Sequence, residues 1–225
     1  MLFLPGKISI VFILLFCCCY LLNAQSNYNG ATIQIGSQLW MAENLNTDKY
    51  WDDAPIPEAK TPREWKEYCD KKIGCYCNYD NEPCYGQMYG KLYNWYAIKR
   101  GVAPHCWRMP SRADFDILLS KIAGPGTGKK MKGMHSWSST WNGDNTSKFN
   151  ALAGGCRNEN GTFSYVGREA FWWTIETRKL GNDRESGLHF FINYDDTYNY
   201  DLSEGFGYSV RCMRDVNQPP PNPCP

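Results

Sequence analysis

The sequence predicts an α+β domain with two or three helices in its first half and short antiparallel strands in its second half. Helix-start signals precede apolar residues at helical spacing between residues 61 and 124, whereas short aromatic runs split by glycine and asparagine follow residue 142. The 225 residues include 11 cysteines and are 43% hydrophobic and 15% aromatic, which indicates a compact, disulfide-linked domain rather than a disordered chain.

The first predicted element is a β-hairpin. Ile33 and Ile35, then Leu39 and Met41, alternate on either side of the Gly-Ser pair at 36–37. A two-residue turn of this type between alternating runs is typical of a hairpin.

Helices are predicted next. Thr61 is a suitable cap, Pro62 suits the first helical position, and Glu64 completes a capping box. The apolar residues of 92–96 also have helical spacing, and Gly101 is a suitable stop.

The clearest helix signal follows Pro110. Ser111 is the expected cap, Asp114 lies in the first turn, and an apolar stripe over 115–122 ends before Gly124.

The second half is predicted to contain strands at 162–166, 171–175, 188–193 and 208–213. Trp172 and Trp173 are adjacent, so on a strand they face opposite sides of the sheet. We expect one of them in the core and include Trp172 among the candidate ligand-binding residues.

Residues 1–24 are predicted to be a cleaved secretory signal. They carry one charge, Lys7, then the apolar run 8–22 and a small residue at the expected cleavage point. That run is shorter than the ~20 residues of a spanning helix, so no membrane span is expected after cleavage. A membrane anchor and a lipoprotein acylated at Cys17, Cys18 or Cys19 are the alternatives. The expected location is secreted or on the outer cell surface, with the periplasm also open.

The remaining chain is predicted to form one domain over residues 30–215 and a proline-rich tail over residues 216–225. Signal removal takes away Lys7 alone among the charges, which leaves 23 basic and 23 acidic side chains. This balance gives no reason to expect nucleic acid as a partner.

Eight cysteines follow the signal, and an even number in an exported chain favours disulfides. A zinc cluster over residues 69–84 is the alternative, but that segment lacks paired Cys-x2-Cys spacing. The eight are Cys69, Cys75, Cys77, Cys84, Cys106, Cys156, Cys212 and Cys224.

Five segments resemble the sequence blocks of the Fibrobacter succinogenes major paralogous domain family. Residues 33–45 (Ile-Gln-Ile-Gly-Ser-Gln-Leu-Trp-Met-Ala-Glu-Asn-Leu) and 89–95 (Tyr-Gly-Lys-Leu-Tyr-Asn-Trp) are similar to the first two blocks. Residues 106–111 (Cys-Trp-Arg-Met-Pro-Ser), 149–155 and 207–215 are similar to the other three. Here Cys106 lies closer to its block than is usual, and tyrosine is commoner than cysteine at position 156.

The resemblance implies a C-type-lectin-like fold, related to the formylglycine-generating-enzyme group, in an exported protein of Bacteroidota-like bacteria. It also implies a bonded pair at Cys77 and Cys84, which flank a short polar loop. We predict a second bond from Cys106 to Cys212 that ties the helical half to the last strand. Cys69 with Cys75 is the next pairing.

The related group contains a cysteine oxidase, which the resemblance implies holds copper between two nearby C-terminal cysteines. Cys212 has no second cysteine at short spacing within the domain. The three histidines, His105, His135 and His189, are isolated in sequence, and the glycine-rich run 124–130 lacks phosphate-loop spacing. We therefore predict a protein that is not an enzyme, with no catalytic residue, no cofactor and no metal.

A binding function is favoured by residues 193–201, Asn-Tyr-Asp-Asp-Thr-Tyr-Asn-Tyr-Asp, which lie between two apolar runs. Tyrosine gives large contact area with few rotamers to freeze, and asparagine gives adaptable hydrogen bonds. Aromatic faces also stack on sugar rings. The candidate ligand-binding residues are Trp172, Tyr194, Asp195, Asp196, Tyr198, Asn199 and Tyr200. An ordinary polar hairpin is the alternative.

Calcium is a further possibility at Asn142, Asp144 and Asn145, whose oxygens suit that ion. Asn-Gly and Asp-Asn pairs are also turn formers, and we predict a turn. The sequence as a whole predicts an exported, non-catalytic binding module for a glycan or protein ligand. A formylglycine-generating-enzyme-like oxidase and a purely structural surface protein are the alternatives.

Overall fold

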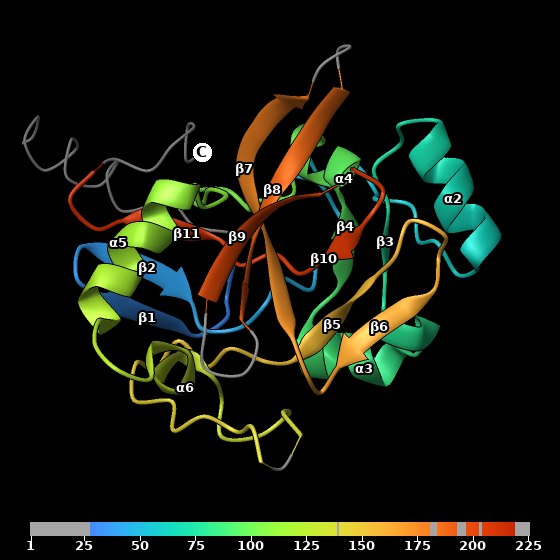
Figure 1. The fold of residues 1–225 in the computed structure, drawn as a ribbon. Coiled ribbons are helices and arrows are strands. Elements are labelled where there is room, and N and C mark those ends of the chain that lie inside the picture. The colour runs from blue at the N-terminus through green and yellow to red at the C-terminus, as the bar shows by residue number, and fades with distance from the viewer. Residues whose placement is uncertain (1–27, 139, 181–183, 193–196, 203, 219–225) are drawn as a thin grey trace, which may run out of the picture.

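The computed structural model describes residues 28–218 apart from 139, 181–183, 193–196 and 203 (Figure 1). The described chain has five α-helices and two β-sheets, so the α+β prediction is confirmed. None of these helices is both long and apolar enough to cross a membrane. The helices are α2 (Pro62–Asp70), α3 (Pro83–Tyr89), α4 (Trp95–Arg100), α5 (Arg112–Ile122) and α6 (Thr127–Met131), and a short 3-10 turn, η1, covers Tyr79–Asn81.

The smaller sheet contains the predicted hairpin. Its strands β1 (Thr32–Ile35) and β2 (Gln38–Met41) are antiparallel, and Gly36 in the turn has φ +62°. The last strand, β11 (Met213–Asp215), pairs with the other edge of β2, opposite Gln38 to Trp40. Both ends of the domain therefore meet in one sheet, and α5 covers it (Figure 1).

The larger sheet has the described order β3-β4-β10-β5-β7-β8-β9, with β6 paired to β5. Its pairs are antiparallel except β5 with β7, which run parallel where Gly155 meets Ala170. The strands are β3 (Tyr76–Cys77), β4 (Leu92–Asn94), β5 (Gly154–Arg157), β6 (Phe163–Val166), β7 (Ala170–Leu180), β8 (Arg184–Ile192), β9 (Thr197–Leu202) and β10 (Gly207–Tyr208).

Two of the predicted helices begin as their caps dictate. The Thr61 hydroxyl accepts from the Glu64 N–H at 3.1 Å, and the Glu64 carboxylate accepts from the Thr61 N–H at 3.0 Å. Ser111 and Asp114 form the same box at the start of α5. The third prediction needs correction, because residues 92–94 pair as strand β4 and α4 starts only at Trp95, capped by the Asn94 side chain.

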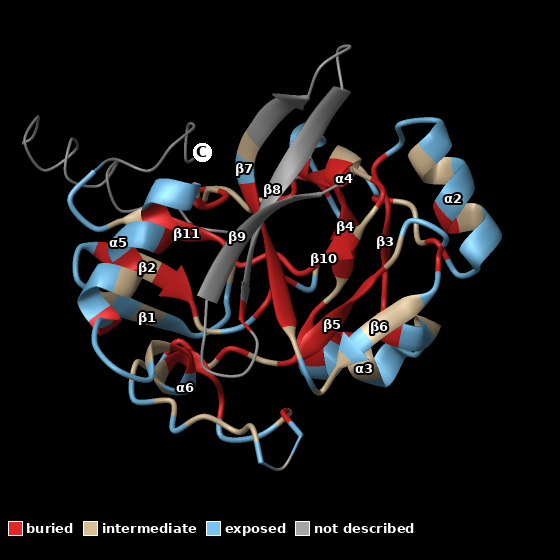
Figure 2. Ribbon diagram, viewed as in Figure 1, coloured by how far each residue is buried: buried red, intermediate tan, exposed pale blue. Residues whose placement is uncertain are grey.

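The predicted strand over 208–213 is also wrong in part, since the chain changes sheets there. The Ser209 N–H donates to Phe171 O, and Ser209 O accepts from the Trp173 N–H, both at 3.1 Å, so the chain runs beside β7 after β10. It then enters the smaller sheet as β11. Residues 209–212 are buried in this crossover (Figure 2).

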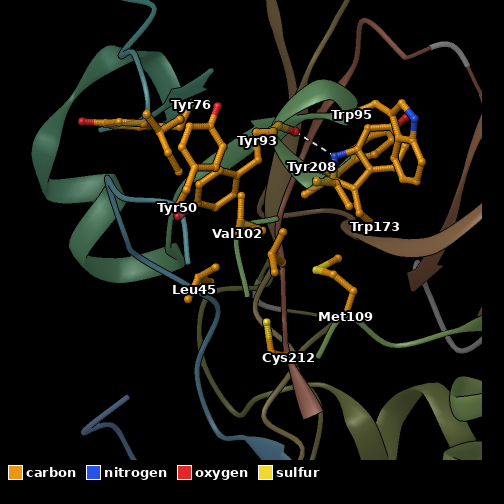
Figure 3. Close-up of a cluster of buried hydrophobic side chains, with 14 of the residues drawn as sticks. Leu45, Tyr50, Tyr76, Tyr93, Trp95, Val102, Met109, Trp173, Tyr208 and Cys212 are labelled. Atoms are coloured by element: carbon orange, nitrogen blue, oxygen red, sulfur yellow. Dashed lines mark hydrogen bonds between the residues drawn. The ribbon is translucent and has the colours of Figure 1, made fainter. Parts of the chain in front are cut away.

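Strand β7 separates two cores. Trp172 packs with α5 and the smaller sheet, while Trp173 packs on the other side with Tyr93, Trp95 and Tyr208. Figure 3 shows this second cluster, in which the Trp173 indole N–H donates to Tyr93 O at 2.7 Å. The two tryptophans face opposite sides as predicted, and both are fully buried.

The predicted disulfides are not formed. Cys77 and Cys84 are free thiols, because Cys77 is buried in β3 whereas Cys84 is exposed at the start of α3. Cys212 is also free and fully buried, so it is not the partner of Cys106, which is disulfide-bonded. Cys69 and Cys75, the next predicted pair, are free as well.

Candidate functional site

A cleft of about 580 Å³ lies along the segment that follows β2. Most of its lining comes from residues 43–53, which form no long helix or strand. The lining residues are Tyr28, Glu43, Asn44, Leu45, Asn46, Thr47, Asp48, Lys49, Tyr50, Trp51, Asp53, Val102 and Pro104.

Backbone hydrogen bonds hold this segment to the domain. The Leu45 N–H donates to Val210 O at 2.8 Å, and Leu45 O accepts from the Lys91 N–H at 3.1 Å. The Trp51 N–H donates to Gly101 O at 3.2 Å. The segment is thus an irregular loop fixed at several points, as the scaffolds of binding loops are.

The wall of the cleft is supported by tyrosines. The Tyr93 hydroxyl donates to Thr47 O at 2.7 Å and accepts from the Thr47 N–H at 2.9 Å. The Tyr50 hydroxyl donates to Gly74 O at 3.2 Å, and burial raises its pKa. The Arg100 guanidinium lies 3.9 Å from the centre of the Tyr50 ring. Tyr50 and Tyr93 belong to the buried cluster of Figure 3.

Asn44 forms the floor. Its Oδ1 accepts from the Trp172 indole at 2.8 Å and from Arg211 Nε and Nη2 at 3.0 and 2.7 Å. Its amide donates to Tyr89 O at 2.8 Å. One side chain therefore connects β7, the crossover at residues 209–212 and the last residue of α3 beneath the cleft.

Arg211 is a fully buried cation. Its described partners are side-chain and backbone carbonyl oxygens and aromatic rings, and none of them is a carboxylate. Besides Asn44, it donates to Phe149 O and Asn150 O, and its guanidinium lies 4.5 Å from the Phe149 ring centre. Burial lowers its pKa to about 9, so it stays protonated at neutral pH. The Arg211 guanidinium therefore binds groups inside the domain and is not presented at the surface of the cleft.

Trp51 is the most exposed tryptophan in the protein. All nine tryptophans are described; seven are buried, Trp141 is half-buried, and Trp51 is 52% exposed. The indole lies against Gly101, where an added Cβ would be 2.7 Å from Trp51 Cδ1, and it meets the His105 ring edge to face at 6.1 Å. It is thus held in place while much of its surface stays open at the cleft.

The model of the Fibrobacter succinogenes major domain family matches residues 33–214. The chain belongs to this family. No curated protein and no solved structure matches it.

The family blocks build the floor of the cleft. Asn44 comes from the first block and Arg211 from the last, and Phe149 opens the fourth. These three residues meet through the contacts described above. In this Fibrobacter succinogenes major domain, the block residues therefore support the cleft from below, while the largely exposed segment 46–53 lies outside the blocks.

The predicted ligand-binding residues have different outcomes. Trp172 is a core residue, since it is fully buried with its N–H on Asn44, so its inclusion as a surface contact was wrong. Tyr194, Asp195 and Asp196 lie outside the described residues. Residues 198–200, Tyr-Asn-Tyr, lie in β9, the edge strand beside β8, rather than in a loop.

The sequence analysis missed the segment 46–53, although its composition carried a signal. Asn-Thr-Asp-Lys-Tyr-Trp-Asp-Asp mixes aromatic, amide and carboxylate side chains as residues 193–201 do. It also lies between a hairpin and a helix cap without a periodic pattern of its own. Only the fold shows that it lines a cleft.

Among the described residues, no three His, Cys, Asp or Glu side chains are grouped so that they could hold a metal ion. The turn predicted at 142–145 lies a few residues later, because the Asp144 and Asn145 N–H groups donate to Lys129 O and Lys132 O, both at 3.1 Å. The turn that follows is closed by the Lys148 N–H, which donates to Asn145 O at 2.9 Å. In the glycine-rich run, the Lys130 ammonium donates to Ile122 O and Ala123 O.

Proposed function

We propose that this domain is an exported, non-catalytic binding module that takes a glycan or protein ligand in the cleft along residues 43–53. The observation that carries the proposal is the exposure of Trp51 at that cleft. Exposed apolar surface on an indole costs free energy in water, so a fixed and open tryptophan favours a binding role.

The shape and chemistry of the cleft support the same role. Its volume lies in the range of ligand pockets, and it combines aromatic side chains with a few polar groups. The hydrogen bonds of Tyr93 and Asn44 preorganise the loop, which lowers the entropy cost of binding.

Export and the C-type-lectin-like fold are parts of the proposal that come from the sequence. The apolar run within residues 1–24 supports secretion or display on the outer surface. Family membership supports the C-type-lectin-like relation through the resemblance stated above. Fractionation of cells that produce the full chain, followed by N-terminal sequencing, tests cleavage after residue 24.

The binding role is tested by a glycan array and a protein pull-down, run in parallel with the wild type and with Trp51→Ala. Tyr165→Ala is the matched control, since Tyr165 is an aromatic residue of similar exposure on β6 outside the cleft. We expect Trp51→Ala to lose at least tenfold in affinity and Tyr165→Ala to bind as the wild type does. Equal binding by all three proteins would exclude this cleft.

The hairpin around residues 193–201 remains a second candidate surface. A variant with Tyr194, Tyr198 and Tyr200 all changed to alanine tests it in the same screen. Loss of binding in this variant, with Trp51→Ala unaffected, would move the site to the hairpin. The oxidase alternative requires that the reduced protein bind copper. A copper titration of the reduced protein that shows no binding would argue against this alternative.

A further inference from the structure

The geometry points to a neutral or amine-bearing glycan, rather than an acidic glycan, as the ligand of the cleft. This inference rests on the proposed function and specifies the class of ligand. It depends on the charges that line the cleft, on the nearby cations and their partners, and on the position of Trp51.

The lining is acidic. It contains the carboxylates of Glu43, Asp48 and Asp53 and one ammonium, that of Lys49, and all four residues are exposed. In the described part of the chain, none of the three carboxylates takes part in an ion pair. The lining therefore has a formal charge of −2 that faces a ligand.

The cations around the cleft already have partners. Arg100 lies 3.6 Å from the Asp52 carboxylate and over the Tyr50 ring. The Lys91 ammonium donates to Asn46 Oδ1 at 2.6 Å and lies over a ring as well. Arg211 is buried beneath Asn44. An anionic ligand would thus meet three carboxylates and a single exposed ammonium, that of Lys49, so the net charge of the lining would repel it.

Carboxylates at neutral pH accept hydrogen bonds and donate none. Sugar hydroxyls and protonated amines are donors, so Glu43, Asp48 and Asp53 match them, whereas a uronic acid carboxylate would be repelled. The Trp51 indole supplies an apolar face for the C–H side of a sugar ring. This combination suits a polyhydroxylated ligand without negative charge.

Two pairs of oligosaccharides of equal length test the inference, because the members of each pair share a backbone and differ in charge and in the methyl or acetyl group that removes it. The first pair is hexagalacturonate and its methyl ester, and the second is chitohexaose and its N-acetylated form. Binding is measured by calorimetry with the full chain at low and at moderate salt.

We expect the methyl ester to bind at least tenfold more tightly than hexagalacturonate. Chitohexaose should bind more tightly than its acetylated form, with an advantage that shrinks as salt is added. Trp51→Phe should retain part of the affinity and Trp51→Ala should lose it for all probes that bind.

The charge itself is tested with the double variant Asp48→Asn, Asp53→Asn. Asp53 has φ +61°, a backbone conformation that asparagine tolerates, so this variant keeps the loop. We expect it to narrow the preference for the methyl ester over the acid at least threefold. Asp80→Asn is the control, because Asp80 is also exposed with φ +51° but lies outside the cleft.

Two results would overturn the inference: hexagalacturonate binding as tightly as its ester, or no binding of any of the four probes. In the first case the proposed function survives if Trp51→Ala still abolishes binding. In the second it survives if the pull-down identifies a protein ligand that depends on Trp51. Retention of all binding by Trp51→Ala would instead remove the cleft itself.

Discussion

At the scale of single residues, Asn44 shows how one amide stabilises a buried charge. Its Oδ1 accepts from Trp172 and Arg211, and its amide N–H reaches Tyr89 O. Removing such a partner leaves buried donors without acceptors, which costs more than the hydrogen bonds themselves. The cost is larger still where a charged group is left behind.

Asn44→Ala is therefore expected to lower the free energy of unfolding by at least ~3 kcal/mol. Asn46→Ala is the control, because Asn46 is exposed two residues away and bonds only the Lys91 side chain. Its cost should stay within about 1 kcal/mol. Urea denaturation followed by far-UV circular dichroism measures both, and equal stability of the two variants would contradict the role assigned to Asn44.

Gly101 positions Trp51 without touching a ligand. It has φ +110°, and a methyl group there would approach the indole to 2.7 Å. Gly124 has a similar φ of +115°, but its added Cβ would have as its nearest neighbour the flexible Lys130 Nζ at 3.4 Å. An alanine would therefore meet similar backbone strain at both positions, but only at Gly101 would its Cβ clash with the indole.

Gly101→Ala and Gly124→Ala should both destabilise the protein by about 1–2 kcal/mol, since an L residue is strained at positive φ. Only Gly101→Ala should weaken binding in the cleft, several-fold, because it displaces Trp51. Calorimetric titration with the ligand found in the array measures the difference. Unchanged binding by Gly101→Ala would show that the indole position does not matter.

At the scale of elements, α5 is anchored at its first turn by charges from other segments. The Arg108 guanidinium bonds the Asp114 carboxylate at 2.6 and 2.8 Å and reaches Asp215 of β11 at 2.8 Å. Both oxygens of Glu176 on β7 accept from the Arg112 N–H, at 2.8 and 2.9 Å. The helix start is thus tied to both sheets.

Acidification should weaken this anchor. Burial alone would raise the pKa of Asp114, but hydrogen bonds from Arg108 and Ser111 outweigh it and hold the pKa below its ordinary value. Between the lower folded pKa and the unfolded value of about 4, the unfolded chain binds more protons, so stability falls as pH falls through this window.

Asp114→Asn should therefore lose stability at neutral pH and show a flatter decline below about pH 4 than the wild type. Asp116→Asn, an exposed position on the same helix, should follow the wild-type curve. Thermal unfolding from pH 7 to pH 2 measures all three. If the stability of Asp114→Asn fell with pH as steeply as that of the wild type, the role assigned to the Asp114 carboxylate would be refuted.

Local signals predicted elements best where the determinants are local. The hairpin turn at Gly36 and the helix caps at Thr61 and Ser111 depend on neighbours in sequence, and all three predictions were correct. The apolar residues of 92–96 have helical spacing, yet residues 92–94 pair with β3 and β10, because tertiary pairing overrides a short local pattern. The chain leaves the larger sheet after Tyr208 and enters the smaller sheet at Met213. This crossover is fixed by the contact of Arg211 with Asn44, 167 residues away in sequence, which no local pattern reveals.

The candidate site was harder to predict than the fold. A tyrosine-rich segment was identified by composition, while Trp51 was missed, because exposure of a tryptophan depends on the position of Gly101 and not on its own neighbours in sequence. Trp172 was misassigned for the same reason. Because α5 packs on one side of β7 and the cluster of Tyr93, Trp95 and Tyr208 packs on the other, both Trp172 and Trp173 are core residues.

At the scale of the whole molecule, six of the seven described cysteines are free thiols, and Cys106 alone among them is disulfide-bonded. Cys75, Cys77, Cys156 and Cys212 are buried free thiols, and burial raises the pKa of Cys77 and Cys156 to about 12. Cys84 is exposed. Thiol reagents react with the thiolate. Burial therefore protects the four buried thiols in two ways, because it blocks access of the reagent and keeps the sulfur protonated.

Among the described free thiols of protein purified without reductant, Cys84 should react fast with a disulfide reagent. Cys69 is part-buried, and burial raises its pKa to about 11, so it should react slowly. The four buried thiols should react only after unfolding in urea. Cys84→Ser should remove the fast phase. The opposite pattern, with no fast thiol in the wild type and a new reactive thiol in Cys84→Ser, would show that Cys77 and Cys84 are bonded after all. Peptide mapping identifies the labelled positions.

The pairing of β2 with both β1 and β11 has a consequence for when the chain folds. Strand β2 gains its second neighbour only from residues 213–215, so the small sheet stays incomplete until nearly the whole domain has left the ribosome. Closing so long a loop late disfavours early stable intermediates. Late completion of this sheet leaves residues 32–41 without their last partner strand during synthesis, which fits the export that we propose.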